Sequence, residues 1–431
     1  MKNIFKILKK YFCDLINSLK VNLNYFDKKY ILIIVLLSII WLVYLNATSF
    51  IIREHDVFGH IKYMREILTH FGFPPTNACY MCYHPPLYYL SALPVYGLFY
   101  VLDFFPGYFL QVLSMLYMLG FVFFSFRIFT LFSSNKNHVF IATLLTMLFP
   151  TVIIHSVRVG NDPLFYFLFA GGLFYTLRWW LKRRDRDFAL AIIISSLSML
   201  TKFNGILLVF LIAILFVIVY KKSLFKMIRK HFKIILIPVL AIAYVYIRKI
   251  LSGGGLGIVE NTGFLNNTIT ITNQLSNFVS IDWNILLNKT YTSPFDDALG
   301  RQYYWIYLFK TSLFGEFRFV NVNPLIPSIM IWSMIGLVMG SIVGFVIALL
   351  KKETKYLPLF LLSTIMIVGS IGLRLSSPYS SSNDFRYILP IVISLVVMNM
   401  RLFKTKFKFP ILIILAIFII SSVIFILDVG F

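Results

Sequence analysis

Long apolar runs recur along the whole chain and are separated by short segments rich in lysine and arginine. Runs of about 17–25 apolar residues are long enough to cross a bilayer as helices. Strands of a membrane barrel would instead alternate apolar and polar positions over about ten residues. The pattern therefore predicts an all-α polytopic membrane protein, with apolar stretches near residues 30–50, 86–103, 109–131, 138–155, 163–180, 187–201, 205–220, 233–250, 326–350, 356–373, 385–400 and 409–428.

The composition supports the same class. Of the 431 residues, 59% are hydrophobic and only 13% are charged, whereas soluble domains have about 45–50% apolar and about 25% charged residues. So few charges cannot cover a soluble surface of this size. A cytosolic enzyme, a disordered chain and a collagen-like fibre are excluded.

The distribution of charge predicts which segments face the cytoplasm, because lysine and arginine favour that side of a membrane. Stretch 86–103 contains prolines and several tyrosines, so we expect it to lie in the external interface without crossing. About eleven transmembrane helices then remain, and 27 of the 40 Lys+Arg fall on the cytoplasmic side with the N-terminus. The net charge of +23 reflects this bias, so no nucleic-acid partner is expected. The acidic residues gather outside, 12 of 17, which catalysis or metal binding would explain.

This topology divides the chain into four parts. Residues 1–29 form a cytoplasmic amphipathic segment, and 30–250 form a transmembrane module with an external loop at 51–107. Residues 251–325 form a second external loop, in which the aromatic stretch 303–319 is expected to lie on the membrane surface. Residues 326–431 form the C-terminal transmembrane helices. The abundance of Lys, Ile, Phe and Asn is typical of an AT-rich, often bacterial, genome, which would place the protein in the cell (inner) membrane.

The first external loop begins with several ionisable residues directly after the first apolar run. Glu54, His55, Asp56 and His60 fall within seven positions, and a helical face continues from His60. They could simply form a hydrated helix end. The alternative is that Asp56, just before a helix, acts as a general base toward a hydroxyl group.

The same loop ends with a C-x-x-C pair followed by a rigid turn. Cys79 and Cys82 precede His84, two prolines and Tyr88. The prolines hold His84 in an extended conformation. The cysteines could form a local disulfide in an oxidising compartment, remain as thiols, or bind a metal together with histidines.

Other ionisable residues lie on the same predicted external side. Asp162 starts a crossing helix, either as a plain N-cap or as a second carboxylate for metal binding or acid–base chemistry. Lys202 joins two crossing helices, and Arg374 and Arg386 lie outside the last helix pair. Arg386 could pair with Asp384 and hold the loop. The alternative is that these cations bind a phosphate.

Asp56 within EHDVFGHIKYM, the HPPLYY run at His84–Tyr89 and the Asn161-Asp162-Pro163 turn resemble a known superfamily. They resemble the GT-C-type membrane glycosyltransferases that use polyprenyl-phosphate sugars, such as protein O-mannosyltransferases and lipid A aminoarabinose transferases. The resemblance covers mainly residues 30–220. It implies a GT-C-like fold with external juxtamembrane helices, Asp56 as catalytic base and Asp162 as a second acidic residue of the site.

The resemblance also implies the partners. They would be a polyprenyl-phosphate-linked sugar, membrane lipids, and a glycan, lipid or protein acceptor at the extracytoplasmic face. Lys202, Arg386 and Arg374 are candidates for binding the donor phosphate, and Glu54, His55, His60, His84 and Tyr88 for binding substrate. Asp56, Asp162 and His84 are candidates for a divalent metal, and no nucleotide cofactor is expected.

Direct displacement of the phosphate would invert the anomeric centre. Two other functions remain open at this level. A transporter or flippase would place charges near mid-membrane, and a glycan ligase or polymerase would share the lipid-linked donor.

Overall fold

The computed structural model describes residues 28–430 except for 53–55, 253–266 and 320–321. Within these residues every regular element is a helix, apart from a single β-bridge between Thr270 and Tyr379. The N-terminal segment 1–27 lies outside the described residues, so its predicted amphipathic helix stays a prediction. The main helices are α2 Lys28–Ala47, α3 Val57–His70, α4 Leu87–Val101, α5 Gly107–Phe132, α6 Lys136–Met147, α7 Pro150–Ser156, α8 Asn161–Lys182, α9 Asp185–Thr201, α10 Ile206–Tyr220, α11 Leu224–Leu251, α12 Ser276–Val279, α13 Trp283–Asn288, α14 Tyr304–Phe314, α15 Leu325–Leu350, α16 Leu357–Ser376, α17 Ile391–Leu402 and α18 Lys408–Gly430.

The predicted all-α polytopic membrane fold is confirmed. Among the described residues seven helices are long and apolar enough to cross a membrane, and α6 with α7 would make an eighth if the bent pair is one span. Two of the other expected crossings are short, since α9 has 17 residues and α17 has 12. The predicted number of eleven therefore stays a prediction.

The expected crossing at 138–155 is broken in two. Helices α6 and α7 meet at an angle of 55°. Phe149, between them, has extended backbone angles, and Pro150 is the first residue of α7. A residue before proline disfavours helical angles because the proline ring clashes with it, which accounts for the break.

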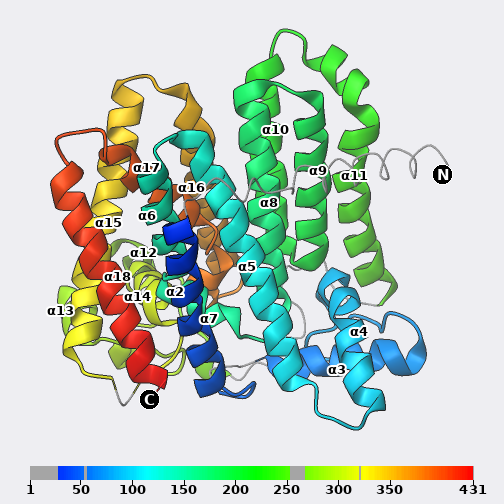
Figure 1. Ribbon diagram of the computed structural model, residues 1–431. Helices are drawn as coiled ribbons and strands as arrows, with labels where there is room; N and C mark the ends of the chain where they lie inside the picture. The colour runs from blue at the N-terminus through cyan, green and yellow to red at the C-terminus, as the bar shows by residue number, and fades with distance from the viewer. Residues whose placement is uncertain (1–27, 53–55, 253–266, 320–321, 431) are drawn as a thin grey trace.

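The long helices run side by side, and α3 and α4, which we expect on the external side, lie at one end of them (Figure 1). Helix α3 extends across this end, and α4 packs against α3 and α5. With 15 residues α4 is short for a crossing, as expected for stretch 86–103. The turns from α10 to α11, α15 to α16 and α17 to α18 lie at the opposite end. These turns belong to basic segments that we expect in the cytoplasm.

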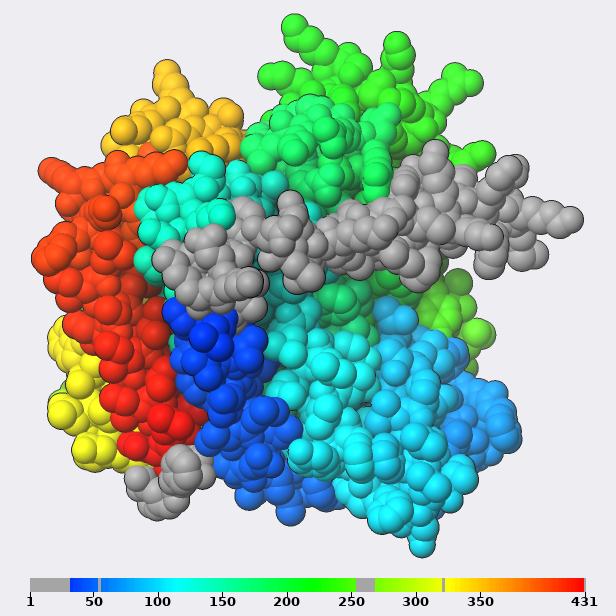
Figure 2. Space-filling model, viewed as in Figure 1, coloured from blue at the N-terminus to red at the C-terminus, as the bar shows by residue number. Residues whose placement is uncertain are grey.

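Helix α8 forms the centre of the bundle. Most of its side chains are buried, and it packs against both α5 and α9. Near the surface, α2 and α18 lie side by side although they are distant in sequence (Figure 2). The bundle thus fixes the ends of α8 and α9 relative to the external helices.

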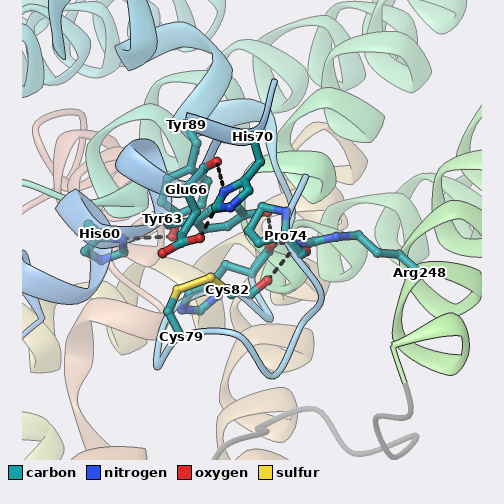
Figure 3. Close-up of a disulfide and its surroundings, with 10 residues drawn as sticks. His60, Tyr63, Glu66, His70, Pro74, Cys79, Cys82, Tyr89 and Arg248 are labelled. Atoms are coloured by element: carbon teal, nitrogen blue, oxygen red, sulfur yellow. Dashed lines mark hydrogen bonds and ion pairs between the residues drawn. A yellow bond between two sulfur atoms is a disulfide. The ribbon is translucent and has the colours of Figure 1, made fainter. Parts of the chain in front are cut away.

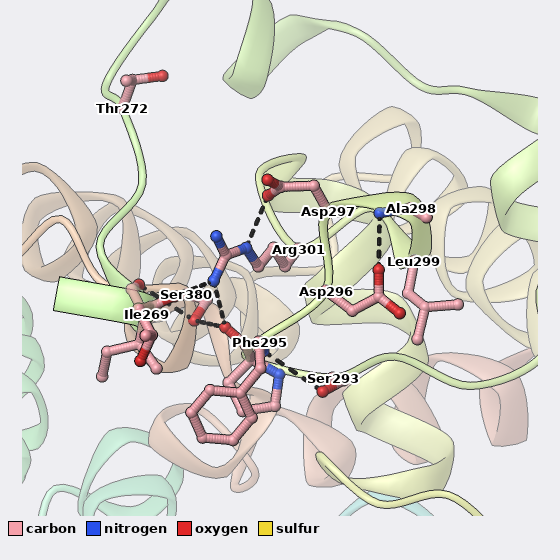
Figure 4. A network of polar contacts seen from close by, with 12 residues as sticks. Ile269, Thr272, Ser293, Phe295, Asp296, Asp297, Ala298, Leu299, Arg301 and Ser380 are labelled. Carbon is pink, nitrogen blue, oxygen red and sulfur yellow. Dashed lines mark hydrogen bonds and ion pairs between the residues drawn. The ribbon is translucent and has the colours of Figure 1, made fainter. Parts of the chain in front are cut away.

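The second external loop is ordered by contacts with the segment after α16. The Arg301 side chain binds the backbone carbonyls of Thr268 and Pro294, and Ser380 donates hydrogen bonds to Ile269 and Pro294 (Figure 4). Helix α14 follows this loop in the chain and contacts α7 and α12. Nine of its eleven residues are buried, so protein covers most of this helix, and its expected place at the membrane surface stays a prediction. Among its aromatic residues, Tyr304, Tyr307 and Phe314 are buried, whereas Trp305 and Phe309 are half-buried.

Candidate functional site

A polar cleft lies where the start of α3, the start of α8, the end of α9 and the segment before α17 meet. It encloses about 100 Å³. Six side chains that we singled out from the sequence line it: Asp56, His60, His84, Asp162, Lys202 and Arg386. They come from positions up to 330 residues apart, as in the Arg386–Asp56 ion pair. The fold therefore brings together the acidic and basic candidates that the topology had only placed on one side.

Asp56 and His60 share one face of the first turn of α3. Asp56 occupies the N-cap position, but its side chain makes no capping hydrogen bond. It faces Arg386 instead, with 3.4 Å between Oδ2 and the guanidinium nitrogen. Four positions later His60 is buried, and its Nδ1 lies 2.9 Å from the Tyr89 hydroxyl. Both side chains thus line the cleft, and the hydroxyl of Tyr89 holds the imidazole in place.

Arg386 lies between two carboxylates. Besides Asp56 it contacts Asp384, with 3.3 Å between Nε and Oδ2. Asp384 also accepts a hydrogen bond from the Arg386 backbone N–H, and the Tyr166 hydroxyl donates one to the Arg386 carbonyl. Burial and the nearby Glu316 raise the pKa of Asp384 to about 7, although Arg386 acts against this shift. The sequence left two interpretations of Arg386, pairing with Asp384 or binding a phosphate. The pairing is confirmed, and phosphate binding stays a prediction.

Asp162 and Lys202 form a buried ion pair between the start of α8 and the end of α9. The Asn161 side chain donates a hydrogen bond to the Thr201 carbonyl and ties the same two ends together. Gly160 allows α8 to begin close to α3, because a Cβ atom there would lie 2.9 Å from His60 Nε2. The Lys202 ammonium also lies 4.6 Å from the centre of the Tyr387 ring. The N-cap of α8 is Gly160 and Asp162 is the second residue of the helix, so the interpretation of Asp162 as a plain N-cap is wrong.

His84 reaches the cleft from the loop that follows α3. Its ring stacks on that of His60 with 6.1 Å between the ring centres. The loop is closed by a disulfide between Cys79 and Cys82 (Figure 3), which was one of the three states that the sequence allowed. Burial lowers the pKa of His60 to about 4 and that of His84 well below its usual value. Both rings are therefore neutral at physiological pH.

Four of the residues expected at the site lie elsewhere or outside the described residues. Tyr88 is fully buried beside the His60 ring and does not line the cleft. Arg374 is buried at the end of α16, where it donates a hydrogen bond to the Thr272 carbonyl and lies over the Phe278 ring. Glu54 and His55 are outside the described residues.

No set of three or more His, Cys, Asp and Glu residues in the described part of the chain is arranged to hold a metal ion. Asp56, Asp162 and His84 all line the cleft, but Asp56 and Asp162 face cations. The disulfide also occupies the two cysteines that a metal could have used. We therefore derive no metal-dependent step.

Sequence reasoning missed several residues of the cleft wall. Arg158 and Lys249 add two cations, and Tyr80, Tyr83 and Tyr387 add aromatic surface. A signal for Lys249 was present, because it is a cation at the external end of a crossing helix, against the usual bias. The tyrosines gave no signal, since tyrosine is common at membrane interfaces whatever its role.

An apolar cavity of about 620 Å³ lies next to the cleft, between α14, α15, α16 and α17. The short helical turn Phe385–Tyr387 separates the two spaces. Phe385 and Ile388 line the cavity, whereas Arg386 and Tyr387 line the cleft. Ile342 and Trp283 in the cavity wall are 50% and 59% exposed. An amphiphile with an ionic head and an apolar tail would find surfaces for both parts side by side.

The low pKa of His60 predicts a loss of stability in acid. The unfolded chain takes up a proton near pH 6.5, whereas the buried ring resists protonation until about pH 4. Stability should therefore fall between these pH values, by roughly 3 kcal/mol for this group alone. Thermal unfolding of the purified protein across this range would measure it. His60→Gln should weaken the pH dependence and leave the contribution of His84, whereas His70→Gln, at an exposed position, should not weaken it; equal pH dependence in all three proteins would contradict the assignment.

Comparison with known proteins agrees with this picture. Residues 83–247 match the family model described as dolichyl-phosphate-mannose-protein mannosyltransferase. This range contains His84, Asp162 and Lys202 of the cleft. No curated protein and no solved structure matches the chain. The chain is thus similar over residues 83–247 to the dolichyl-phosphate-mannose-protein mannosyltransferases, and its resemblance to the GT-C-type membrane glycosyltransferases is confirmed.

Proposed function

We propose that the protein transfers a sugar from a polyprenyl-phosphate donor to a hydroxyl group of a glycan, lipid or protein, at the extracytoplasmic face of the cell membrane. The observation that carries the proposal is the convergence of Asp56, Asp162, Lys202 and Arg386 in one cleft beside an apolar cavity. The disulfide supports the location of the site, because disulfides persist in oxidising compartments. The prenyl chain of such a donor lies in the same membrane as the protein.

The cations of the cleft suit the donor phosphate. The guanidinium of Arg386 can bind two phosphate oxygens at once, and Lys202 adds a compact positive charge. Both are held by carboxylates in the free protein. A phosphate entering the cleft would compete with Asp56 for Arg386. Donor binding would then release the Asp56 carboxylate toward the acceptor.

The proposed reaction needs only the two substrates and side chains of the cleft. The acceptor oxygen attacks the anomeric carbon of the sugar, and its proton passes to the Asp56 carboxylate. The bond between the anomeric carbon and the phosphate oxygen breaks, and the lipid phosphate leaves with the electron pair. Lys202 and Arg386 stabilise the charge that develops on the phosphate. A single displacement inverts the configuration; a product with retained configuration would refute this mechanism.

The function is tested by supplying membranes that contain the protein with a panel of radiolabelled lipid-phosphate sugars. We expect one donor to lose its label to a hydroxyl-bearing acceptor, and only when the protein is present. Analysis of the labelled product identifies the acceptor as glycan, lipid or protein. Label that crosses the membrane while still on its lipid would instead indicate a flippase.

The apolar cavity is proposed to hold part of the prenyl chain. Ser363 lines it, so Ser363→Trp should raise the KM for a long-chain donor about tenfold by filling the space. A donor with a three-isoprene chain should be less affected. Val368→Trp, on the exposed face of the same helix, is the matched control. Equal effects of both substitutions on both donors would contradict this use of the cavity.

A further inference from the structure

Arg248 on α11 holds the loop that carries His84, although it does not line the cleft itself. Its guanidinium donates hydrogen bonds to three backbone carbonyls of this loop (Figure 3). The distances are 2.9 Å to His84, 2.8 Å to Cys82 and 2.9 Å to Pro74. The same group lies 5.4 Å from the centre of the Tyr63 ring of α3. One side chain thus joins α11, α3 and the loop.

The loop needs such support because residues 71–86 form turns without a regular helix or strand. Buried backbone carbonyls must find donors, and no ladder of hydrogen bonds supplies them here. The disulfide closes only the turn from Cys79 to Cys82. Gly59 of α3 lets the loop approach closely, since a Cβ atom there would lie 2.7 Å from Met81 Cγ.

We propose that Arg248 is a positioning residue, which fixes the loop wall of the cleft so that Tyr80, Tyr83 and His84 face the substrate. The consequence for catalysis rests on the proposed function, whereas the clamp itself does not. Arginine suits this task because its planar group presents five donors in a fixed fork. Lysine would keep the charge but could not satisfy three carbonyls in this arrangement.

Different contacts hold the two walls of the cleft in place. Lys202 and Arg386 come from the end of α9 and the segment before α17, where Asp162, Asp56 and Asp384 hold them. The guanidinium of Arg248 donates its hydrogen bonds to the carbonyls of the loop and to neither of these two segments. Loss of the clamp should therefore impair transfer while binding of a prenyl phosphate survives.

The first experiment measures the clamp without any assumption about the reaction. The full-length protein is treated with a phosphine reductant, and the freed Cys79 and Cys82 thiols are alkylated and followed by peptide mass spectrometry. Both cysteines are buried, so reduction requires the loop to open. Arg248→Lys should speed reduction about tenfold, because hydrogen bonds from a charged donor to buried carbonyls are lost.

Arg301→Lys is the matched control, since Arg301 also binds two backbone carbonyls, in the other external loop (Figure 4). It should leave the reduction rate unchanged. A reduction rate of Arg248→Lys within twofold of the wild type would overturn the clamp.

The second experiment separates positioning from general damage. Farnesyl phosphate serves as the probe, and its affinity is measured beside kcat and KM for sugar transfer. For Arg248→Lys we expect kcat to fall about tenfold or more, with the affinity for farnesyl phosphate within twofold of the wild type. A parallel loss of both would overturn the positioning role. If reduction is accelerated but the wild type neither binds farnesyl phosphate nor transfers sugar, the clamp stands and the proposed function fails.

Discussion

Replacing Asp56 with asparagine is expected to lower kcat for sugar transfer about a thousandfold while the protein still folds. Asparagine has nearly the same shape but cannot accept the proton of the acceptor hydroxyl, and general bases contribute about 10²–10⁴-fold to rates. Arg386 keeps its second partner, Asp384, so the segment before α17 should stay in place. Initial rates with a saturating donor measure the loss, and the thermal unfolding midpoint reports the fold.

The matched control is Asp297→Asn. Asp297 is an exposed carboxylate of the external surface that also pairs with an arginine, Arg301. It lies outside the cleft wall, so its loss should leave kcat within twofold of the wild type. An Asp56→Asn protein with wild-type kcat would remove Asp56 as the base. The KM of the donor in this variant is informative too, because Arg386, released from Asp56, should bind the phosphate at least as well.

Much of the cleft was predictable, because the order of the helices and the side of the membrane on which each one ends restrict which residues can line it. Asp56 follows α2, Asp162 begins α8 and Lys202 ends α9, so a consistent topology places all three at one end of the bundle. Charged residues at helix ends are also rare enough in an apolar chain to stand out. What topology could not give is which helix ends are neighbours, and the ion pairs of Lys202 and Arg386 supply that.

Arg374 and Arg386 illustrate the limit of such reasoning. Both follow apolar stretches on the same predicted side, and both were assigned to the donor phosphate. In the structure the Arg386 guanidinium lies between Asp56 of the cleft and the buried Asp384, and the Arg374 guanidinium binds the Thr272 carbonyl. The choice depends on the path of the second external loop, for which the sequence has no periodic pattern.

Hydrogen bonds to backbone groups and cavities between helices also cannot be predicted from the sequence. The three carbonyls that bind Arg248 belong to residues of different types, so no motif marks them. The apolar cavity between α15 and α16 is lined by ordinary apolar side chains. Whether such side chains leave a space depends on helix packing, because the same apolar pattern fits a closed interface.

Variants of the buried ion pair between Asp162 and Lys202 are expected to show whether its charges serve the fold or the reaction. Lys202→Met leaves the Asp162 carboxylate buried without its main cation, and breaking a buried pair costs about 3–5 kcal/mol. The thermal unfolding midpoint should fall accordingly, and transfer should be lost. Adding Asp162→Asn removes the uncompensated charge, so the double variant should recover most of the lost stability, a coupling that a double-mutant cycle quantifies.

Activity in the double variant then decides between the two roles. If Lys202 binds the donor phosphate, the restored fold should still show less than about one hundredth of the wild-type kcat/KM, because a charged contact to the leaving group is missing. If the pair only holds α8 to α9, activity should return together with stability. Lys230→Met is the control for removing a lysine from an ion pair, since Lys230 and Asp185 are both about half exposed; it should change neither the midpoint nor the rate. Recovery of activity in Asp162→Asn/Lys202→Met would therefore leave Arg386 as the principal cation for the phosphate.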